Sequence, residues 1–421
     1  MKILKLSAYY APESISSSHL TEDLERAYID AGFDIDVYAP IPTRGVSAEV
    51  REKYKKIKYE EKYDGKIKIH RFSMSREGKN PIFRAIRYLR VNLKHYRRGK
   101  RAKDVDVVMA GSTPPTQGML CARVAKKLSK KYGRKVPFIF NLQDIFPDSL
   151  VNAKMTKKGS LIWKIGRRIE DYTYRNADKI IVISEGFKKN IMEKGVPEEK
   201  IVVIPNWVNT ESVYPIDRKD NILFDRYGLD REKFYICYSG NIGHSQNLDM
   251  LVEAAKELSV ELPEVGFVLI GEGAAKEALT ERVEKEGITN VRILPFQPYE
   301  EISHVFSLGD AGLIISKPGI GGSSVPSKTW SIMAAERPVL ASFDKDSELY
   351  KLVKDTGCGV ASDASSKDDF KRAVLELYSD AQVRQEMGKR GRAYLEEELN
   401  KDKCVGEYVR TIKETFGNAN S

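Results

Sequence analysis

Short apolar segments alternate with longer amphipathic segments along the whole chain. In the first half, the apolar segments have the length and composition of strands, and helical patterns separate them. The expected strands of this half are Lys2–Tyr9, Phe33–Tyr38, Ile67–Phe72, Asp106–Ala110, Val136–Leu142, Lys179–Ile183 and Ile201–Ile204. The helical patterns include His19–Asp30, Gln117–Lys131 and Ser160–Asn176. This alternation predicts parallel sheets that are covered by helices on both faces.

The second half repeats the same rhythm. Its expected strands are Phe234–Ser239, Gly266–Ile270, Val291–Leu294, Ala311–Ile315 and Pro338–Ala341. Between the halves, residues 205–228 lack a clear period and contain two prolines, so we place the domain junction there. A chain of 421 residues also exceeds what one hydrophobic core usually serves. We therefore predict two α/β domains, residues 1–205 and 206–400, with ligands at the carboxyl ends of the strands.

The composition narrows the class of protein. The four cysteines lie far apart and form no CxxC pair, which argues against a zinc site and fits a reducing cytosol. The N-terminus is too short and too polar for a signal peptide. No apolar run approaches the roughly 18 residues of a membrane-spanning helix. We expect a cytoplasmic protein that is either free or bound to a membrane surface.

Charge is divided unevenly along the chain. Residues 1–205 contain 43 Lys and Arg and 24 Asp and Glu, a net charge of +19. The remaining residues contain 27 and 36, a net charge of −9. The first half is therefore expected to bind anionic surfaces. Without an RNP, zinc-finger or helix-turn-helix signature, this basicity is a weak indication of nucleic-acid binding.

A glycine-containing turn precedes a helical pattern late in the second half. We expect the helix at about Pro326–Ala335, with Ser323 or Ser324 as its N-cap. Lys328 falls in the first turn, where free N–H groups and the positive end of the helix dipole favour a phosphate or diphosphate. A capped helix with a solvated lysine is the alternative. The glycines of the turn are Gly319, Gly321 and Gly322.

Further candidates follow two more strands of the second half. Gly240 and Gly243 permit a close approach of the backbone to a ligand, and His244 in the same loop is a candidate phosphate or sugar contact. Gly271 and Gly273 form a GxG turn, which alone indicates little more than a turn.

Aromatic and acidic candidates complete the set. Phe296 either packs on a nucleobase or is a core aromatic of a proline-rich loop. His19 either donates to a sugar hydroxyl or has a structural role. Asp144 follows an expected strand and precedes Pro147. Its carboxylate could orient or deprotonate an acceptor hydroxyl, or it could cap an Asx turn.

Six motifs, taken together, resemble the family 4 retaining glycosyltransferases and, within them, the WbuB-like bacterial enzymes that build surface polysaccharides. The motifs are YYAPE at Tyr9–Glu13, QDIFPDS at Gln143–Ser149, IPNWVNTESVYP at Ile204–Pro215, YSGNIG at Tyr238–Gly243, LIGEG at Leu269–Gly273 and VPSKTWSIMAAERPVLA at Val325–Ala341. Each motif is modest alone, but their order and spacing are specific. The resemblance covers nearly the whole chain.

The resemblance implies the GT-B fold, with two Rossmann-like parallel-sheet domains facing a cleft. The N-terminal domain would bind the acceptor and the C-terminal domain the nucleotide-sugar donor, while residues 401–421 would return as a helix to the N-terminal domain. The implied reaction retains the anomeric configuration and needs no metal or other cofactor. The branch implies a donor of the UDP-N-acetylhexosamine type. It also implies an acceptor glycan on a polyprenyl diphosphate, in capsule or O-antigen synthesis.

The motifs also assign site residues. Lys328 is expected to stabilise the leaving diphosphate, and Asp144 to act on the acceptor hydroxyl. The expected acceptor side contains Glu13, Ser17 and His19. The expected donor side contains Gly240, Asn241, Gly243, His244, Gly271, Gly273, Phe296, Gly321, Gly322, Ser323, Ser324, Ser327 and Ser331.

The chain departs from the family pattern at four positions. Relatives commonly carry glutamates where this chain has Ser323 and Ser331, and often Arg and Lys where it has Asn241 and Gln246. The departures leave open an altered donor choice or a dead transferase. We expect an active enzyme because the turn and Lys328 are intact. Two different functions also fit the motifs: a GT-B-fold sugar-nucleotide epimerase or a non-catalytic polysaccharide-assembly scaffold.

Residues 76–103 predict an amphipathic basic helix, with eleven Lys or Arg and one acidic residue. Its apolar stripe is Ile82, Ile86, Leu89, Leu93 and Tyr96. The basic residues expected at lipid headgroups are Arg84, Arg87, Lys94 and Arg97. Such a helix can lie in an anionic membrane surface, which would hold the protein on the inner leaflet. An ordinary surface helix, packed by its stripe, is the alternative.

Overall fold

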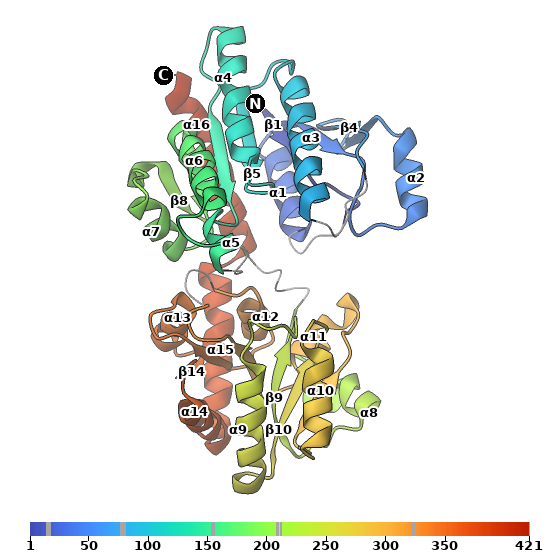
Figure 1. Ribbon diagram of the computed structural model, residues 1–421, viewed down its shortest axis with the longest axis vertical. Helices are drawn as coiled ribbons and strands as arrows, with labels where there is room; N and C mark the ends of the chain where they lie inside the picture. The colour runs from blue at the N-terminus through green and yellow to red at the C-terminus, as the bar shows by residue number, and fades with distance from the viewer. Residues whose placement is uncertain are drawn as a thin grey trace. The chain divides into compact units, whose positions relative to one another are not determined.

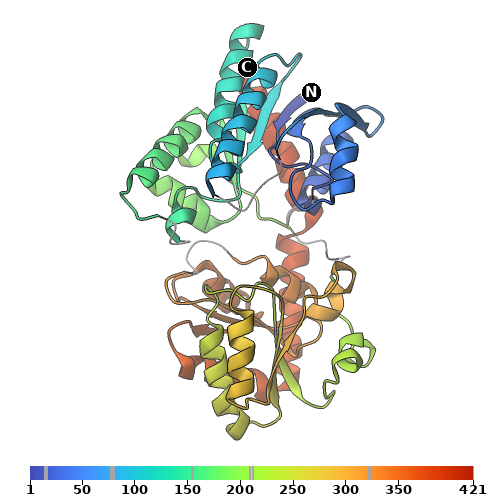
Figure 2. The same ribbon diagram turned by 45° about the vertical axis from the view of Figure 1, so that its right-hand side comes forward.

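The structure is a computed structural model that describes residues 1–13, 18–75, 81–152, 156–207, 210, 213–320 and 325–420. At residues 18, 19, 81, 82, 84, 85 and 152 it describes the backbone only. The chain forms two compact units (Figures 1 and 2). The N-terminal unit contains Met1–Pro205 and Cys404–Ser421, and the C-terminal unit contains Asn206–Lys403. Among the helices described, none is long and apolar enough to cross a membrane.

The described residues of the N-terminal unit form an eight-stranded sheet in the order β3-β4-β2-β1-β5-β6-β7-β8. The strands are β1 Lys2–Leu6, β2 Asp34–Pro40, β3 Tyr59–Lys62, β4 Ile67–Phe72, β5 Val107–Gly111, β6 Phe138–Leu142, β7 Lys179–Val182 and β8 Ile201–Val203. Strand β3 pairs antiparallel with β4, so the prediction of a wholly parallel sheet is wrong at this edge. Its sequence YEEK lacks the apolar run that identifies the other strands.

Helices connect these strands and cover the sheet. They are α1 Ser18–Asp30, α2 Ala48–Lys56, α3 Pro81–Gly99, α4 Gln117–Tyr132, α5 Asp148–Asn152, α6 Leu161–Asn176 and α7 Glu185–Glu193, with the short 3-10 turn η1 Glu198–Lys200. Helix α4 contacts α3 and α6, and the three helices lie side by side in both views of the unit (Figures 1 and 2). The core between α4 and the sheet includes Leu120, Val124, Val108 and Phe138.

Helix α16, Lys401–Asn420, completes the N-terminal unit. Tyr408 on this helix is fully buried. Further along, the Lys413 ammonium lies 5.8 Å from the ring centroid of Phe33, and the Arg134 guanidinium lies 6.0 Å from that of Phe416. The end of the chain therefore packs on the first unit rather than on the unit that precedes it in sequence.

The described residues of the C-terminal unit form a six-stranded parallel sheet in the order β11-β10-β9-β12-β13-β14. The strands are β9 Phe234–Ser239, β10 Val265–Ile270, β11 Val291–Leu294, β12 Ala311–Ile315, β13 Val339–Phe343 and β14 Gly359–Asp363. Strand β14 was not among the expected strands. Its sequence GVASD contains one β-branched residue, too weak a signal for a strand.

The helices of this unit are α8 Ile222–Tyr227, α9 Leu248–Glu261, α10 Lys276–Lys285, α11 Ile302–Phe306, α12 Lys328–Ala334, α13 Glu348–Thr356, α14 Lys367–Ser379 and α15 Ala381–Glu398, with the 3-10 turns η2 Arg218–Asp220 and η3 Tyr299–Glu301. Helix α12 lies close against β12. A Cβ atom at Gly312 would come within 2.5 Å of the Ile332 side chain, so the glycine lets the helix approach the sheet.

Candidate active site

Two loops of the C-terminal unit are bound to each other at the carboxyl ends of β9 and β10. The amide of Gly240 donates to the carbonyl of Ile270 (2.8 Å), and that of Ile242 donates to the carbonyl of Glu272 (2.8 Å). The Ile242 carbonyl in turn accepts from the amide of Ala275 (3.0 Å). These bonds fix the loop after β9 against the loop after β10, at the edge where parallel sheets bind ligands.

The glycines of these loops make room for protein atoms. A Cβ atom at Gly271 would lie 1.8 Å from the carbonyl oxygen of Gly240, and one at Gly273 would lie 2.2 Å from that of Ile242. The GxG sequence therefore serves the packing of the two loops. At Gly243, a Cβ atom would lie 2.4 Å from the amide nitrogen of the Asn241 side chain.

Gly240 provides the space that Lys328 occupies. Its φ of +141° is a conformation that favours glycine. A Cβ atom on this residue would lie 1.9 Å from the Nζ of Lys328. The lysine side chain therefore reaches from α12 to the loop after β9, and the close approach expected between this glycine and a ligand is made by the lysine.

Lys328 is a largely buried cation held by an aromatic residue. Its Nζ donates a hydrogen bond to the Tyr238 hydroxyl (3.2 Å) and lies 4.7 Å from the centroid of that ring. The hydroxyl donates its own proton to the carbonyl of Asn241 (2.7 Å). Among the described residues, no carboxylate forms an ion pair with Lys328. Burial lowers the pKa of the lysine to about 8.

The helix that carries Lys328 differs from the prediction at both ends. It spans Lys328–Ala334, and its N-cap is Ser327, whose side chain makes no capping bond. The prediction of Ser323 or Ser324 as N-cap is therefore wrong: the chain becomes helical only after Pro326. Ser327 is exposed and Ser331 is half-buried. The candidates outside the described residues are Gly321, Gly322, Ser323 and Ser324.

Several polar and aromatic candidates in the loops that follow β9 and β11 are exposed. The Asn241 and His244 side chains are exposed, and Phe296, after β11, is 68% exposed. Exposure contradicts the interpretation of Phe296 as a core aromatic. The amide of Gly319, expected to be free for an anion, instead donates to the Asp344 carboxylate (2.9 and 3.1 Å).

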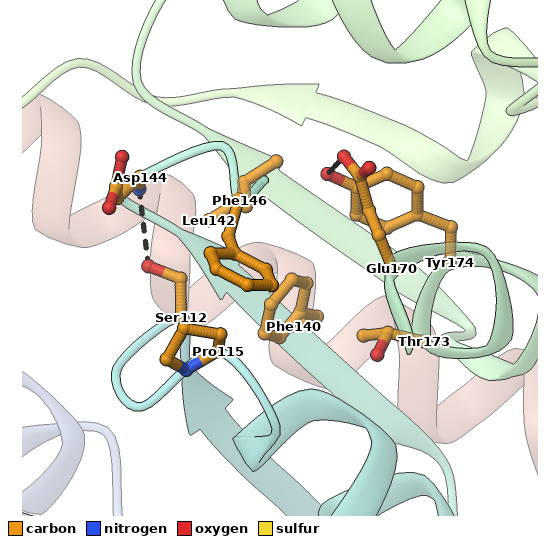
Figure 3. A pocket seen from close by; sticks show the side chains of 9 residues that line it. All are labelled: Ser112, Pro115, Phe140, Leu142, Asp144, Phe146, Glu170, Thr173 and Tyr174. Atoms are coloured by element: carbon orange, nitrogen blue, oxygen red, sulfur yellow. Dashed lines mark hydrogen bonds between the residues drawn. The ribbon is translucent and has the colours of Figure 1, made fainter. Parts of the chain in front are cut away.

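Asp144 lies at the carboxyl end of β6 in the N-terminal unit. The amides of Gln143 and Asp144 both donate to the Ser112 hydroxyl (3.2 and 3.1 Å), which ties this loop to the end of β5 (Figure 3). The Asp144 carboxylate reaches the surface. Desolvation by the protein atoms around it raises its pKa, and the Ser149 hydroxyl opposes that shift. A carboxylate of this kind can take a proton more readily than a solvated one.

A small cavity of about 10 Å³ adjoins this loop, and Glu170 on α6 lines it with Asp144 (Figure 3). Glu170 accepts from the Tyr174 hydroxyl (2.7 Å) and the Lys194 ammonium (2.9 Å), and it pairs with Arg167. Burial raises the pKa of this carboxyl against these partners. Glu170 was not among the predicted site residues, because its charged neighbours in the sequence are typical of a solvated helix surface.

Glu13 supports a loop instead of facing an acceptor. It is buried, and one carboxylate oxygen accepts from the amides of Thr43 (2.6 Å) and Arg44 (2.9 Å). The other oxygen accepts from the amide of Tyr10 (3.1 Å). Ser17 lies outside the described residues, as does the side chain of His19.

The placement of Arg87 at lipid headgroups is wrong. Its side chain is buried, with the guanidinium 4.9 Å from the ring centroid of Tyr9 and bonded to the Thr43 hydroxyl. Lys94 is half-exposed, and its ammonium donates one hydrogen bond to the carbonyl of Ser73 (2.6 Å). Arg97 is exposed, and the side chain of Arg84 lies outside the described residues.

The described residues contain no cluster of three or more His, Cys, Asp or Glu that could hold a metal ion. The independence of the reaction from metal stays a prediction.

Two family profiles match the chain. The family described as Glycosyltransferase Family 4 matches residues 18–212, and the one described as Glycosyl transferases group 1 matches residues 219–394. The probable glycosyltransferase WbjE of Pseudomonas aeruginosa is 27% identical over 259 residues, which is 62% of each chain and so under two thirds of that relative. The putative colanic acid biosynthesis glycosyl transferase WcaI of Escherichia coli is 26% identical over 70% of this chain and 72% of its own.

Solved structures share the fold over almost the whole chain. The sucrose-phosphate synthase of Thermosynechococcus elongatus superposes with a TM-score of 0.73 at 14% identity, covering 99% of both chains. HepE of Anabaena, crystallised with UDP, superposes with a TM-score of 0.72 at 14% identity, covering 98% of this chain and all of its own. These likenesses confirm the GT-B fold.

Proposed function

Because the chain belongs to family 4 of the glycosyltransferases, we propose that it moves a sugar from a nucleotide diphosphate to an acceptor hydroxyl with retention of the anomeric configuration. The observation that supports this proposal most directly is the environment of the Lys328 ammonium. A partly buried ammonium 3.2 Å from a tyrosine hydroxyl, without a carboxylate partner among the described residues, is suited to an incoming anion. A diphosphate is the anion that develops charge in this reaction.

Lys328 would act on the leaving group. As the sugar–phosphate bond breaks, negative charge grows on the diphosphate, and a fixed ammonium in a partly desolvated site stabilises that charge. We assign no protein nucleophile, since front-face attack by the acceptor hydroxyl needs none. The ammonium also takes the role that a divalent metal fills elsewhere, and we propose that the reaction runs without one.

The proposed donor is a UDP-sugar of the N-acetylhexosamine type. Support for the nucleotide comes from the likeness to HepE, which was crystallised with UDP and with UDP-glucose. Exposed Phe296 and the exposed loop residues Asn241 and His244 are the groups that we propose contact the nucleotide or sugar. Ser331, where relatives carry a glutamate, is half-buried and is the proposed hydroxyl contact.

The proposed acceptor is a glycan on a polyprenyl diphosphate. WcaI is named for colanic acid biosynthesis. Two relatives of 23% identity are named alpha-galactosylglucosyldiacylglycerol synthase, from Streptococcus pneumoniae, and alpha-monoglucosyldiacylglycerol synthase, from Acholeplasma laidlawii. These names support both a polysaccharide product and a lipid-borne acceptor. Asp144, whose pKa is raised by desolvation from the protein atoms around it, is the proposed base or orienting group for the acceptor hydroxyl.

Thermal unfolding in the presence of UDP, GDP and dTDP tests the donor assignment. A ligand that binds only the native state raises the melting temperature, by an amount that grows with its concentration over its Kd. We expect UDP to stabilise the protein more than the other two. Clear stabilisation by GDP or dTDP without stabilisation by UDP would overturn the assignment.

A further inference from the structure

Helix α3 directs most of its large apolar side chains away from the unit to which it belongs. Four apolar side chains on its outer surface are 40–68% exposed: Phe83, Ile86, Leu89 and Leu93. The surface packed on the rest of the unit contains Val91 together with two charged or polar residues, Arg87 and His95, and all three are buried. Burial lowers the pKa of His95 to about 4, so this side chain is neutral at pH 7. A helix whose leucines face outward while an arginine faces inward has an apolar surface that its own fold leaves uncovered.

The start of α6 shows the same pattern. Three apolar side chains there are 49–74% exposed: Leu161, Ile162 and Ile165. Glu170, roughly one and a half turns beyond Ile165, is buried. The helix therefore also directs apolar side chains outward and a carboxylate inward.

The two apolar clusters lie along one edge of the N-terminal unit. Helix α3 leads into β5, α4 joins β5 to β6, and α6 leads into β7, and these strands are parallel. The three helices therefore begin at the same edge of the sheet, with α4 between the other two (Figures 1 and 2). Phe83 and Ile86 lie in the first turns of α3, and Leu161 and Ile165 lie in the first turns of α6.

The charges around these clusters are almost all positive. Helices α3 and α4 together contain eleven Lys and Arg, of which Arg87 is buried, and no acidic residue. The two acids of α6, Glu170 and Asp171, both pair with Arg167 on the same helix. Exposed cations that stand among the apolar side chains include Arg90 and Lys164.

We propose that the outer surfaces of α3 and α6, with the basic surface of α4 between them, form a docking surface for an anionic lipid bilayer. The apolar side chains would enter the boundary between headgroups and acyl chains, while the long basic side chains reach the phosphates. The charge is complementary to acidic lipid, and each cation near such a surface adds attraction that salt screens. This docking is independent of the proposed glycosyl transfer.

Sedimentation with vesicles tests the docking. Full-length protein is mixed with phosphatidylcholine vesicles that contain graded phosphatidylglycerol, at low and at high salt. We expect the bound fraction to rise with anionic lipid and to fall with salt. Equal recovery in the supernatant for neutral and anionic vesicles at low salt would overturn the proposal.

Trp163 provides a local readout on α6. It is half-exposed, whereas the other two tryptophans of the chain, Trp207 and Trp330, are 2% and 9% exposed. We expect its emission to shift to shorter wavelength on anionic vesicles and to be quenched by brominated acyl chains. Vesicle binding without quenching would contradict insertion at α6.

Matched variants distinguish vesicle binding through α3 and α6 from nonspecific binding by any exposed apolar side chain. The double variants Leu161→Gln/Ile165→Gln and Phe83→Gln/Leu89→Gln are each expected to lower the vesicle partition coefficient by at least about tenfold, because interfacial binding scales with buried apolar area. The control Val260→Gln/Leu375→Gln removes two side chains that are 84% and 50% exposed on the C-terminal unit, and it should bind as the parent does.

Thermal stabilisation by UDP and self-association are measured on the same variants, so that loss of docking can be distinguished from loss of donor binding and from a protein–protein surface. Thermal stabilisation by UDP should be unchanged in all three, so a failure of docking does not depend on donor binding. Unchanged vesicle partition in both helix variants would overturn the proposal. Self-association that these variants abolish, without vesicle binding, would overturn it in favour of a protein–protein surface.

Discussion

Lys328 is the residue on which the proposed chemistry depends most. Replacing it with Ala should leave the fold intact, since the side chain contacts a loop at the sheet edge and has no ion-pair partner among the described residues. Turnover should fall by roughly 10²- to 10³-fold, the scale of one lost transition-state contact. Steady-state kinetics on Lys328→Ala measures this loss, with Lys345→Ala, an exposed lysine of the same unit, as the control. A Lys328→Ala enzyme with normal turnover would remove the diphosphate assignment.

The pKa of the same lysine predicts a pH dependence. Burial lowers it to about 8, and only the protonated form attracts a diphosphate. The affinity for UDP should therefore be highest below pH 8 and should weaken as the pH rises through that value. Titration calorimetry from about pH 6.5 to about pH 9.5 brackets that pKa and measures the trend, and Lys328→Ala should abolish it. A UDP affinity that stays constant across this range would contradict the role of the ammonium.

Gly240 tests the geometry around the lysine without removing its charge. An alanine there places a Cβ atom 1.9 Å from the Nζ of Lys328, so the ammonium must move. We expect Gly240→Ala to lower turnover nearly as much as Lys328→Ala does. Gly406→Ala on α16 is the matched control, because a Cβ atom there meets nothing within 4 Å. Normal turnover in Gly240→Ala would show that the observed lysine position is not the functional one.

At the scale of elements, the loop between β6 and α5 carries Asp144 and is the proposed acceptor-side part of the site, as Lys328 on α12 is the proposed donor-side part. Asp144→Asn removes its base while Ser112 still holds the backbone through two amides. We expect turnover to fall by about 10²-fold or more, with UDP binding unchanged. Asp171→Asn, on neighbouring α6, is the control for loss of a nearby carboxylate. Equal turnover in both variants would assign Asp144 to the turn alone.

The elements show which features a sequence pattern can predict. Apolar runs placed most strands within a few residues, because burial of a parallel strand demands such a run. The edge strand β3 was not predicted, because none of the residues in its sequence YEEK is buried and it therefore lacks an apolar run. Helix α12 begins later than expected because N-cap preference alone does not state which serine becomes the cap.

Long-range contacts explain the candidates that the sequence misplaced. Glu13 and Arg87 read as functional polar residues, yet each is buried against Thr43, which lies tens of residues away. The sequence predicts the apolar stripe of α3, but it does not predict that most of the stripe faces outward while Arg87 and Val91 face inward. Lys328 was identified from its place near a helix start, whereas its contact with Gly240 joins segments that no local pattern connects.

At the scale of the whole molecule, the division of charge follows the division into units. The strongly basic half belongs to the unit with the proposed membrane surface, and the acidic half to the unit with the proposed donor site. An acidic unit needs a local cation if it is to bind the proposed diphosphate, and Lys328 would provide that cation. This arrangement favours an enzyme over a passive scaffold, whose buried lysine would have no anion to meet.

The most direct test of glycosyl transfer is product analysis with an acceptor. Purified protein is incubated with UDP-N-acetylglucosamine and related UDP-sugars, with a polyprenyl-diphosphate-linked sugar on anionic vesicles and with EDTA present, and the lipid fraction is analysed by mass spectrometry. The account predicts an acceptor heavier by one sugar residue, with release of UDP, and no such product from Lys328→Ala. An epimerised or unchanged nucleotide sugar with no glycosylated lipid, across all the donors, would contradict it.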